Sequence, residues 1–497
     1  METVDNCSQE KKAKWNERKH FLRQILISSG GWSTYFIMGI SFGAPTVFIP
    51  QLRNEANSAT AISEETASWI PAIIVYAGLP WSFIFPILMK YIGRKYSFGF
   101  VCLSNVVTFI LFYFSTSVNH IIVSELINGI NTGSHFTVSV MIITEYASPK
   151  NRGFFLTMKS ATLFWGILLS NAVGTFFHWR NIGLVGLVVS IYSLLIAFIM
   201  PESPFWLASK QRYEQCAISH RFILGKDKEA EIALEKLINY QMAVHSNTKP
   251  KDFKLKAFLA YYLNVVSSKP FYKPYILSFC VQCLYVFSGK VVFSVYAIDI
   301  ISKITAGHKM SPYTAMLILD AVSVLCMYIG CGIVKLVTRR KLLISTCMAG
   351  ISFLLSMSVY AFLIKLKVME ENNYLALTML IGYSISICLG PVILTQTIVG
   401  ELVPIENRGL ASCCIDVSTK TLLGTVVKIS PFIFRVAGTH GAFLFYGAST
   451  SIFLSLLYKF LPETKDKTLQ EIAETMVGKK QDAVSHEAAL FIPDAKA

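Results

Sequence analysis

The stretch "GELVPIENRG", residues 400–409, decides the fold because its pattern of charges occurs twice in the chain. In this stretch Glu401 is followed seven residues later by Arg408, which precedes a glycine. The same spacing separates Glu145 from Arg152, again with a glycine next in the sequence. Each stretch lies between two long apolar runs, so the repeat predicts a chain built from two related halves.

The composition indicates a polytopic membrane protein. Of the 497 residues, 53% are hydrophobic and only 15% are charged, which excludes an ordinary soluble enzyme. About 20 apolar residues in a helix cross the hydrocarbon core of a bilayer. Twelve runs fit this length: 25–49, 68–89, 98–114, 121–144, 154–177, 182–200, 274–298, 313–334, 342–363, 374–399, 410–433 and 442–461.

Two further pairs of short motifs repeat in the same order. "GRK" (residues 93–95) matches "TRRK" (338–341), and "PESPFWL" (201–207) matches the start of "PETKDKTLQEI" (462–472). The three pairs are 245 to 261 residues apart, and chance rarely preserves order and spacing together. Two halves with a solute site between them are the layout of a transporter that rocks one half against the other.

The basic residues indicate how the chain lies in the membrane. We expect a tail (1–24), a six-helix half (25–200), a linker (201–273), a second half (274–461) and a second tail (462–497). On this plan 33 of the 45 Lys and Arg lie on the side of the termini. This positive-inside bias predicts that both termini are cytoplasmic. The net charge of +15 therefore reflects membrane topology, and no nucleic-acid partner is expected.

The repeated charges have a physical task in such a transporter. An arginine in a tight loop can pair with a carboxylate at a neighbouring helix end, and several such pairs form a network. A network that forms in one state and breaks in another biases a two-state equilibrium. The alternative is that these charges only anchor the chain at the membrane surface. The predicted cytoplasmic gating network comprises Arg94, Glu145, Arg152, Glu202, Arg339, Arg340, Glu401, Arg408 and Glu463.

These motifs, together with "SFGAPTVFIPQL" (41–52) and "TASWIPAI" (66–73), resemble the sugar porter family of the major facilitator superfamily. The insect facilitated trehalose transporters are a similar group. The resemblance covers residues 25–472 and implies an all-α membrane protein with twelve transmembrane helices in two six-helix halves. It also implies alternating access, a sugar or sugar-like small-molecule solute, linker helices that brace both halves, a monomer as transport unit and a location in the plasma membrane.

The chain departs from this family at the positions that usually contact sugar. Most of the amide and tryptophan side chains expected there are replaced, and only Gln282 lies near enough to substitute for one of them. Because such contacts define a hexose site, we expect a solute other than an ordinary hexose. The candidate positions on this comparison are Ser160, Gln282, Tyr285, Gln396, Thr419 and Lys420.

Charged residues deep inside the predicted spans also need partners, because an unpaired charge in the bilayer costs at least about 2.5–3.5 kcal/mol. Lys290 and Asp320 fall at the same depth on neighbouring helices, which predicts an ion pair. Asp416 and Lys420 are four residues apart, a favourable order within one helix. We expect Lys290 to face the central cavity. Its alternative roles are to bind solute, only to tether two helices, or to snorkel to the outer interface.

Three other lysines, Lys159, Lys428 and Lys459, lie close enough to span ends to snorkel to the interface.

Proton coupling is not expected. Residues 33–48 hold no acid, and Glu125 stands where proton-linked relatives carry arginine, so it is either a carboxylate without its usual partner or a solvated acid. Facilitated diffusion is the simpler interpretation. The alternatives are a carrier of a non-sugar, possibly anionic, organic solute and a non-transporting nutrient receptor. No nucleophile, metal or nucleotide motif is found, so neither an enzyme nor a cofactor is expected.

Overall fold

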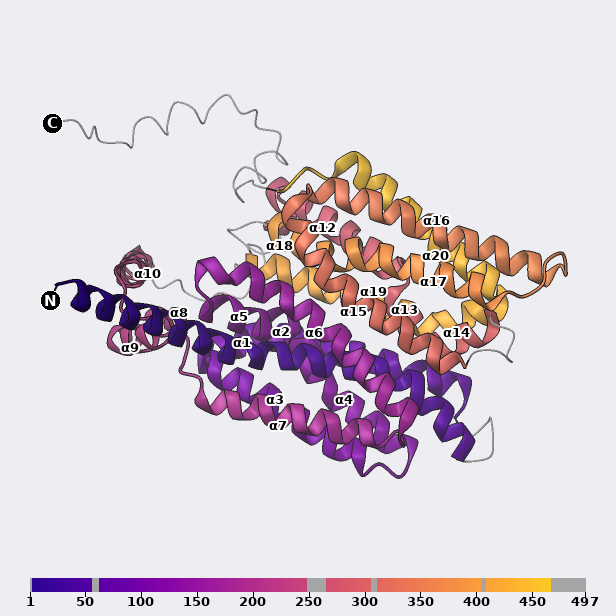
Figure 1. Ribbon diagram of the computed structural model, residues 1–497, viewed down its shortest axis with the longest axis horizontal. Helices are drawn as coiled ribbons and strands as arrows, with labels where there is room; N and C mark the ends of the chain where they lie inside the picture. Colours follow the sequence, from indigo (N-terminus) through magenta and orange to yellow (C-terminus); the bar gives the residue numbers. More distant parts are fainter. Residues whose placement is uncertain (1, 56–61, 248–264, 305–310, 404–407, 466–497) are drawn as a thin grey trace.

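The computed structural model describes residues 2–55, 62–247, 265–304, 311–403 and 408–465, and the regular structure in these ranges is helical. Two helical bundles lie side by side with their helices roughly along the long axis of the molecule (Figure 1). The first bundle contains α1 (Glu2–Glu55), α2 (Glu64–Ile92), α3 (Arg94–Tyr113), α4 (Val118–Ser134), η1 (His135–Ser139), α5 (Val140–Tyr146), α6 (Pro149–Phe176) and α7 (Asn181–Ile199).

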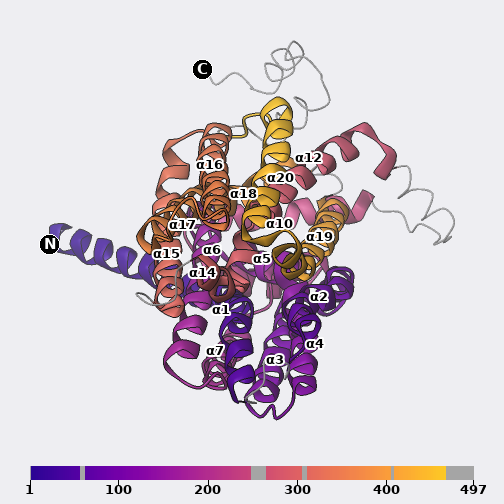
Figure 2. The same cartoon turned by 90° about the vertical axis from the view of Figure 1, so that its right-hand side faces the viewer.

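The second bundle follows a set of linker helices. It contains α12 (Lys269–Phe287), α13 (Lys290–Val295), α14 (Ala297–Ile304), α15 (Pro312–Leu336), α16 (Arg339–Lys365), α17 (Asn373–Ile387), η2 (Cys388–Val392), α18 (Ile393–Leu402), α19 (Arg408–Val436) and α20 (Gly438–Phe460). The two halves meet where α2 lies against α19 and α6 against α15 (Figure 2). They also meet where α1 contacts α13.

Eleven helices of the described ranges are long and apolar enough to cross a membrane. The remaining predicted span is the fourth in chain order, residues 121–144. It corresponds to α4, η1 and α5, whose residues are more polar. Its buried side chains include Glu125, Asn128 and Asn131, which face the interior of the bundle rather than lipid. The arrangement is therefore the expected twelve-helix fold, with one span made of shorter helical pieces.

The two halves share an unusual feature. A five-residue π-helical segment interrupts the fourth span at η1 and the tenth span at η2. Such segments are rare and occur often at functional sites, because the wider turn redirects nearby side chains. The duplication seen in the sequence thus extends to an irregularity that the sequence motifs did not predict.

The seventh span is broken, whereas the sequence predicted one continuous helix over residues 274–298. α12 ends at Phe287 and α13 begins at Lys290, with Gly289 between them at φ +82°. This left-handed conformation suits glycine, which has no Cβ to clash with the backbone. The break rotates the residues after Gly289 relative to their positions in a straight helix. It therefore changes the direction in which the Lys290 side chain points.

The N-terminal tail continues the first helix, since α1 begins at Glu2 rather than near residue 25. The tail is rich in Lys, Glu, Ala and Arg, which are strong helix formers. The linker folds into α8 (Pro204–Ser209), α9 (Tyr213–Leu224) and α10 (Lys228–Asn247), which lie beside α1 at the end that we call the linker end (Figure 1).

Described contacts tie these linker helices to the first half. The Arg23 guanidinium donates to the Phe222 carbonyl at 2.9 Å, and the Trp206 indole donates to the Lys90 carbonyl at 3.2 Å. Bracing of the second half by the linker remains a prediction.

Candidate functional site

A cavity lies between the two halves, about midway along their helices. It offers about 100 Å³ to the centres of water-sized molecules, several times the space that one buried water needs. Both π-helical segments reach it, through His135 and Phe136 of η1 and Val392 of η2. Seven of the nine predicted solute-contact residues line it: Ser160, Gln282, Tyr285, Lys290, Gln396, Thr419 and Lys420.

The remaining two candidates, Asp320 and Asp416, do not line this cavity. Asp320 lines a smaller neighbouring cavity that also includes Lys290. Asp416 lies behind Lys420 and is only 2% exposed. Neither carboxylate therefore faces the central cavity, although each lies near a lysine that lines it.

Gln282 is the most informative neutral residue of the cavity. Its side chain is fully buried, and neither its amide oxygen nor its amide nitrogen has a hydrogen-bond partner among the described residues. Thr132 and His135 also line the cavity, and each has one polar side-chain atom without a hydrogen-bond partner among the described residues. Because a buried polar group without a partner costs about 1–3 kcal/mol, these groups suit a ligand that supplies hydroxyls.

The predicted Lys290–Asp320 ion pair is wrong for this conformation. The Lys290 ammonium donates to the hydroxyls of Ser323 and Ser384, each at 2.8 Å. Asp320 instead accepts a 2.6 Å hydrogen bond from the Asn171 amide of the other half. The depth estimate was sound, since both residues line the same small cavity, but the break at Gly289 rotates Lys290 away from the direction of a straight helix.

The second predicted pair is confirmed. The Lys420 ammonium lies 2.5 Å from Asp416 Oδ2 within α19, and it also donates to the Ser82 hydroxyl of α2 at 2.6 Å. Lys420 therefore joins a buried ion pair to a hydrogen bond that crosses between the halves. Its position in the cavity wall leaves it accessible to a solute.

Lys159 does not snorkel, contrary to the sequence-based prediction. It is 7% exposed, lines the cavity and donates to the Tyr35 hydroxyl at 3.1 Å. Its ammonium also lies 4.9 Å from the centroid of the Tyr35 ring. The residue precedes Ser160, which the family comparison placed at the solute site, and it lies ten positions after Pro149, the first residue of α6. This distance from the start of the helix was the feature of the sequence that could have predicted a buried Lys159.

Glu125 is not a solvated acid. It is 4% exposed and accepts a 3.1 Å hydrogen bond from the Asn128 amide, which also donates to Ser41. It does not line the central cavity.

The end opposite the linker helices, called the far end here, is closed by contacts between the halves. The Thr46 hydroxyl of α1 donates to the carbonyls of Ser294 and Val295 at 2.8 and 2.7 Å. Lys428 donates to the Ser68 hydroxyl at 2.7 Å and to the Glu65 carbonyl at 3.3 Å, both near the start of α2, and lies over the Trp69 ring.

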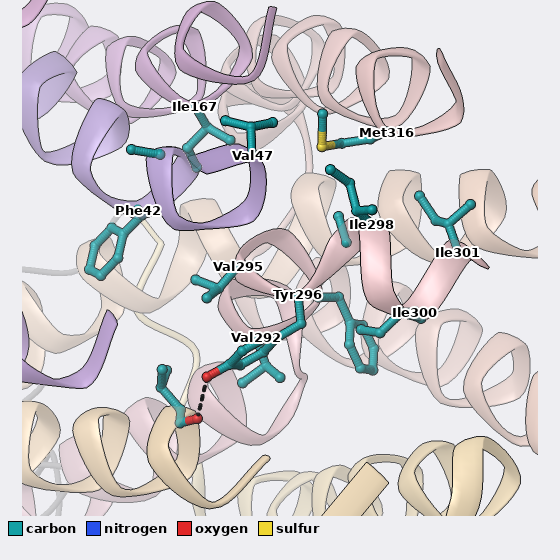
Figure 3. Close-up of a cluster of buried hydrophobic side chains, with 14 of the residues drawn as sticks. Phe42, Val47, Ile167, Val292, Val295, Tyr296, Ile298, Ile300, Ile301 and Met316 are labelled. Atoms are coloured by element: carbon teal, nitrogen blue, oxygen red, sulfur yellow. Dashed lines mark hydrogen bonds between the residues drawn. The ribbon is translucent and has the colours of Figure 1, made fainter. Parts of the chain in front are cut away.

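Apolar side chains of both halves reinforce this closure. Figure 3 shows Phe42 and Val47 of α1 gathered with Val295 and neighbouring residues of α13 and α14 in one buried cluster. At its edge the Tyr296 hydroxyl donates to the Val427 carbonyl at 3.1 Å. The far end is therefore sealed by both apolar packing and hydrogen bonds.

At the linker end, the first half contains a compact charge assembly. Arg94 Nη2 lies 3.1 Å from Glu145 Oε1. The Glu202 carboxylate accepts from the backbone N–H groups of Arg94 and Lys95 at 2.8 and 3.2 Å, and so caps the start of α3. Gly93 makes this possible, since a Cβ there would lie 2.3 Å from a Glu202 oxygen.

The second half repeats the assembly. Arg339 pairs with Glu401, and the Glu463 carboxylate accepts from the backbone N–H groups of Arg339 and Arg340, each at 3.1 Å. The repeated "PES" and "PET" motifs thus place a carboxylate on the N-terminus of the third helix of each half.

The remaining two predicted members are Arg152 and Arg408. Arg152 Nε has no hydrogen-bond partner among the described residues. Arg408 begins α19, and its side chain lies outside the described residues.

Replacing Glu202 by alanine is expected to lower the free energy of unfolding by about 0.5–2 kcal/mol, because two N–H groups of α3 lose their acceptor. Thermal unfolding of the purified protein in detergent measures the change. Glu214→Ala is the matched control, since Glu214 is exposed in the first turn of α9. Equal melting temperatures for the two variants would contradict a capping role.

Comparison with known proteins places the chain among curated relatives. The facilitated trehalose transporter of Aedes aegypti is 23% identical over 448 residues, which cover 89% of this chain and 54% of that protein. The facilitated trehalose transporter of Polypedilum vanderplanki is 22% identical over 463 residues, covering 92% of this chain and 88% of that protein. The chain thus spans about half the length of the Aedes protein.

Solved structures share the architecture. The inward open conformation of the xylose transporter XylE from E. coli matches with a TM-score of 0.72 at 16% identity, over 91% of this chain and 99% of that chain. A structure of the proton:xylose symporter XylE bound to 6-bromo-6-deoxy-D-glucose matches with a TM-score of 0.70 at 16% identity, over 93% and 100%. The model of the family described as "Sugar (and other) transporter" matches residues 25–476, and the chain therefore belongs to this family.

Proposed function

We propose that this multi-pass membrane protein carries a saccharide or a related polyhydroxylated solute across the bilayer by alternating access. The observation that carries the proposal is Gln282, a fully buried amide with both polar atoms unpartnered among the described residues, in a cavity between two similar halves. Membership in a transporter family supports the same conclusion, as do the names of the trehalose transporters that the chain resembles.

The charge assemblies at the linker end support a mechanism in which each half moves as a unit. Arg94, Glu145 and Glu202 join three helix ends of the first half, and Arg339, Glu401 and Glu463 do so in the second. When one half rocks against the other, contacts between the halves break while contacts within each half remain. In this proposal the assemblies hold each half together, whereas the far-end contacts of Thr46 and Lys428 open.

Facilitated diffusion is the proposed energetic mode. In the part of the chain that the structure describes, no Asp or Glu side chain lines the central cavity, and this supports transport without a titrating carboxylate in contact with the solute. Glu125 is held by Asn128 outside the cavity lining.

The proposed setting is the plasma membrane, with both termini in the cytoplasm and a monomer as the transport unit. The bias of basic residues toward the linker end supports this orientation. Solute and bilayer are the proposed partners.

Uptake into proteoliposomes tests the proposal. Purified protein is reconstituted, and the entry of labelled trehalose, glucose and glucuronate down their gradients is measured without an imposed ion gradient. Gln282→Leu is expected to lower uptake at limiting solute by about 5- to 150-fold, because it removes a buried hydrogen-bonding partner worth about 1–3 kcal/mol. Gln215→Leu, on the exposed face of α9, is the control. Wild-type uptake by Gln282→Leu, or no uptake of any of the three solutes, would contradict the proposal.

A further inference from the structure

Among the described residues, the central cavity is lined by three lysines, Lys159, Lys290 and Lys420, and by no carboxylate. Each lysine is 7% exposed or less. Carrying three ammonium groups at this depth is costly unless negative charge balances them. The neighbourhood of each lysine shows which of them is balanced.

Only one of the three has an ion-pair partner in the described part of the chain. Lys420 is paired with Asp416 at 2.5 Å. Lys290 contacts two serine hydroxyls, and Asp320 lines the small cavity beside it without an ion pair. Lys159 has no carboxylate within ion-pair distance among the described residues, and its one hydrogen bond goes to the neutral Tyr35 hydroxyl.

The hydrogen bonds of Lys159 leave capacity for a ligand. The Tyr35 hydroxyl donates to the His135 carbonyl at 3.1 Å, so it accepts from Lys159. An ammonium has three N–H donors. Two donors of Lys159 are therefore without a partner among the described residues, in the wall of a cavity that also holds the unpartnered amide of Gln282.

We propose that Lys159 binds the carboxylate of the solute, so that the substrate class is a sugar acid, such as a uronate or an aldonate, rather than a neutral sugar. The inference rests on the proposed transport function and specifies its substrate. Lys159 supplies the charge-assisted hydrogen bonds, and Gln282 meets the hydroxyls of the same molecule.

The balance of charge favours a carboxylate over a phosphate. Three lysines line the cavity; Asp416 is paired with Lys420, and Asp320 lines the small cavity that also includes Lys290. The surplus is one positive charge, which a monoanion cancels. A phosphate ester carries about −1.5 to −2 charges at neutral pH and would leave the site with an excess of negative charge.

A matched set of solutes tests this inference in proteoliposomes that contain the full-length protein. Glucuronate, glucose and glucose 6-phosphate share one ring and differ in the group at C6. In the wild type we expect glucuronate to enter faster than glucose at equal limiting concentration. In Lys159→Met the ratio of glucuronate to glucose uptake is expected to fall by about 10- to 100-fold. Lys159→Arg is expected to retain part of the preference.

Lys459→Met serves as control, because Lys459 is exposed near the end of α20, and the ratio should stay at the wild-type value. The ratio compares two solutes in one preparation, so loss of folded protein cancels. Thermal stabilisation by each solute is measured in parallel, because it reports binding independently of transport.

The outcomes separate the two proposals. Entry of glucose or trehalose without a preference for glucuronate overturns the sugar-acid inference alone, and so does an equal loss of both solutes in Lys159→Met. A preference for glucose 6-phosphate overturns the assignment of a monoanion. If no solute enters, the transport proposal fails; stabilisation by glucuronate of the wild type but not of Lys159→Met then still supports the binding site, and its absence overturns it.

Discussion

Replacing Gly166 by alanine is expected to prevent normal assembly of the first half. A Cβ on Gly166 would lie 2.1 Å from the Phe36 carbonyl oxygen and 3.0 Å from Gly39 Cα, both on the backbone of α1. Backbone cannot move aside as a flexible side chain does, so α1 and α6 must separate. We expect a loss of at least about 3 kcal/mol, the upper end of overpacking costs.

Thermal unfolding and solute uptake of Gly166→Ala measure the effect. Both should fall, because α1 carries Tyr35 and α6 carries Lys159, which meet in the cavity. Gly99→Ala is the matched control: this glycine also lies within a helix, but a Cβ there meets nothing within 4 Å. If the two variants unfold at the same temperature, the close crossing of α1 and α6 is not needed for stability.

Replacing Lys420 by methionine is expected to lower the free energy of unfolding by about 3–5 kcal/mol. The substitution leaves the carboxylate of Asp416, only 2% exposed, without its cation. The desolvation of that carboxylate, rather than the lost attraction alone, sets the size of the effect.

The double variant Lys420→Met, Asp416→Leu separates the two contributions. Removing both charges of a buried pair is often neutral, so this variant should recover most of the lost stability. Unfolding in detergent of the wild type, both single variants and the double variant gives the coupling energy as a double-mutant cycle. Additive losses would show that the two side chains do not stabilise each other.

Much of the fold follows from the sequence. Apolar runs and the three repeated motifs predicted two six-helix halves, and the structure contains both. The motifs were informative because each performs a local task that needs particular residue types. Glu202 and Glu463 cap helix starts, and Arg94 and Arg339 pair with the carboxylates seven residues before an Arg-Gly pair.

The irregular parts of the helices were not predictable in the same way. Hydropathy reports which residues avoid water, but not whether the backbone continues at a constant 100° per residue. The break at Gly289 and the π-helical segments η1 and η2 change the direction of side chains without changing the apolar pattern. This is why Lys290 was placed at the correct depth but assigned the wrong partner.

The candidate site was predicted in part for a related reason. The positions taken from the family comparison all line the cavity, because an offset along one helix carries over when motifs fix the ends of that helix. They account for six of the lining residues. Lys159 was assigned to the interface because long lysine side chains often extend to water. That rule considers the length of the side chain and not the groups around it. The aromatic and carbonyl surroundings of Lys159, supplied by Tyr35 and His135 from distant spans, can be known only from the folded chain.

The surplus lysine of the cavity has an electrical consequence. One elementary charge moved through a potential of 100 mV changes its energy by about 2.3 kcal/mol. A carrier that holds one uncompensated positive charge when empty, and none when a monoanion is bound, feels the membrane voltage mainly in its empty state. The return of the unloaded protein, and not the passage of the loaded one, is then the step whose rate follows the voltage.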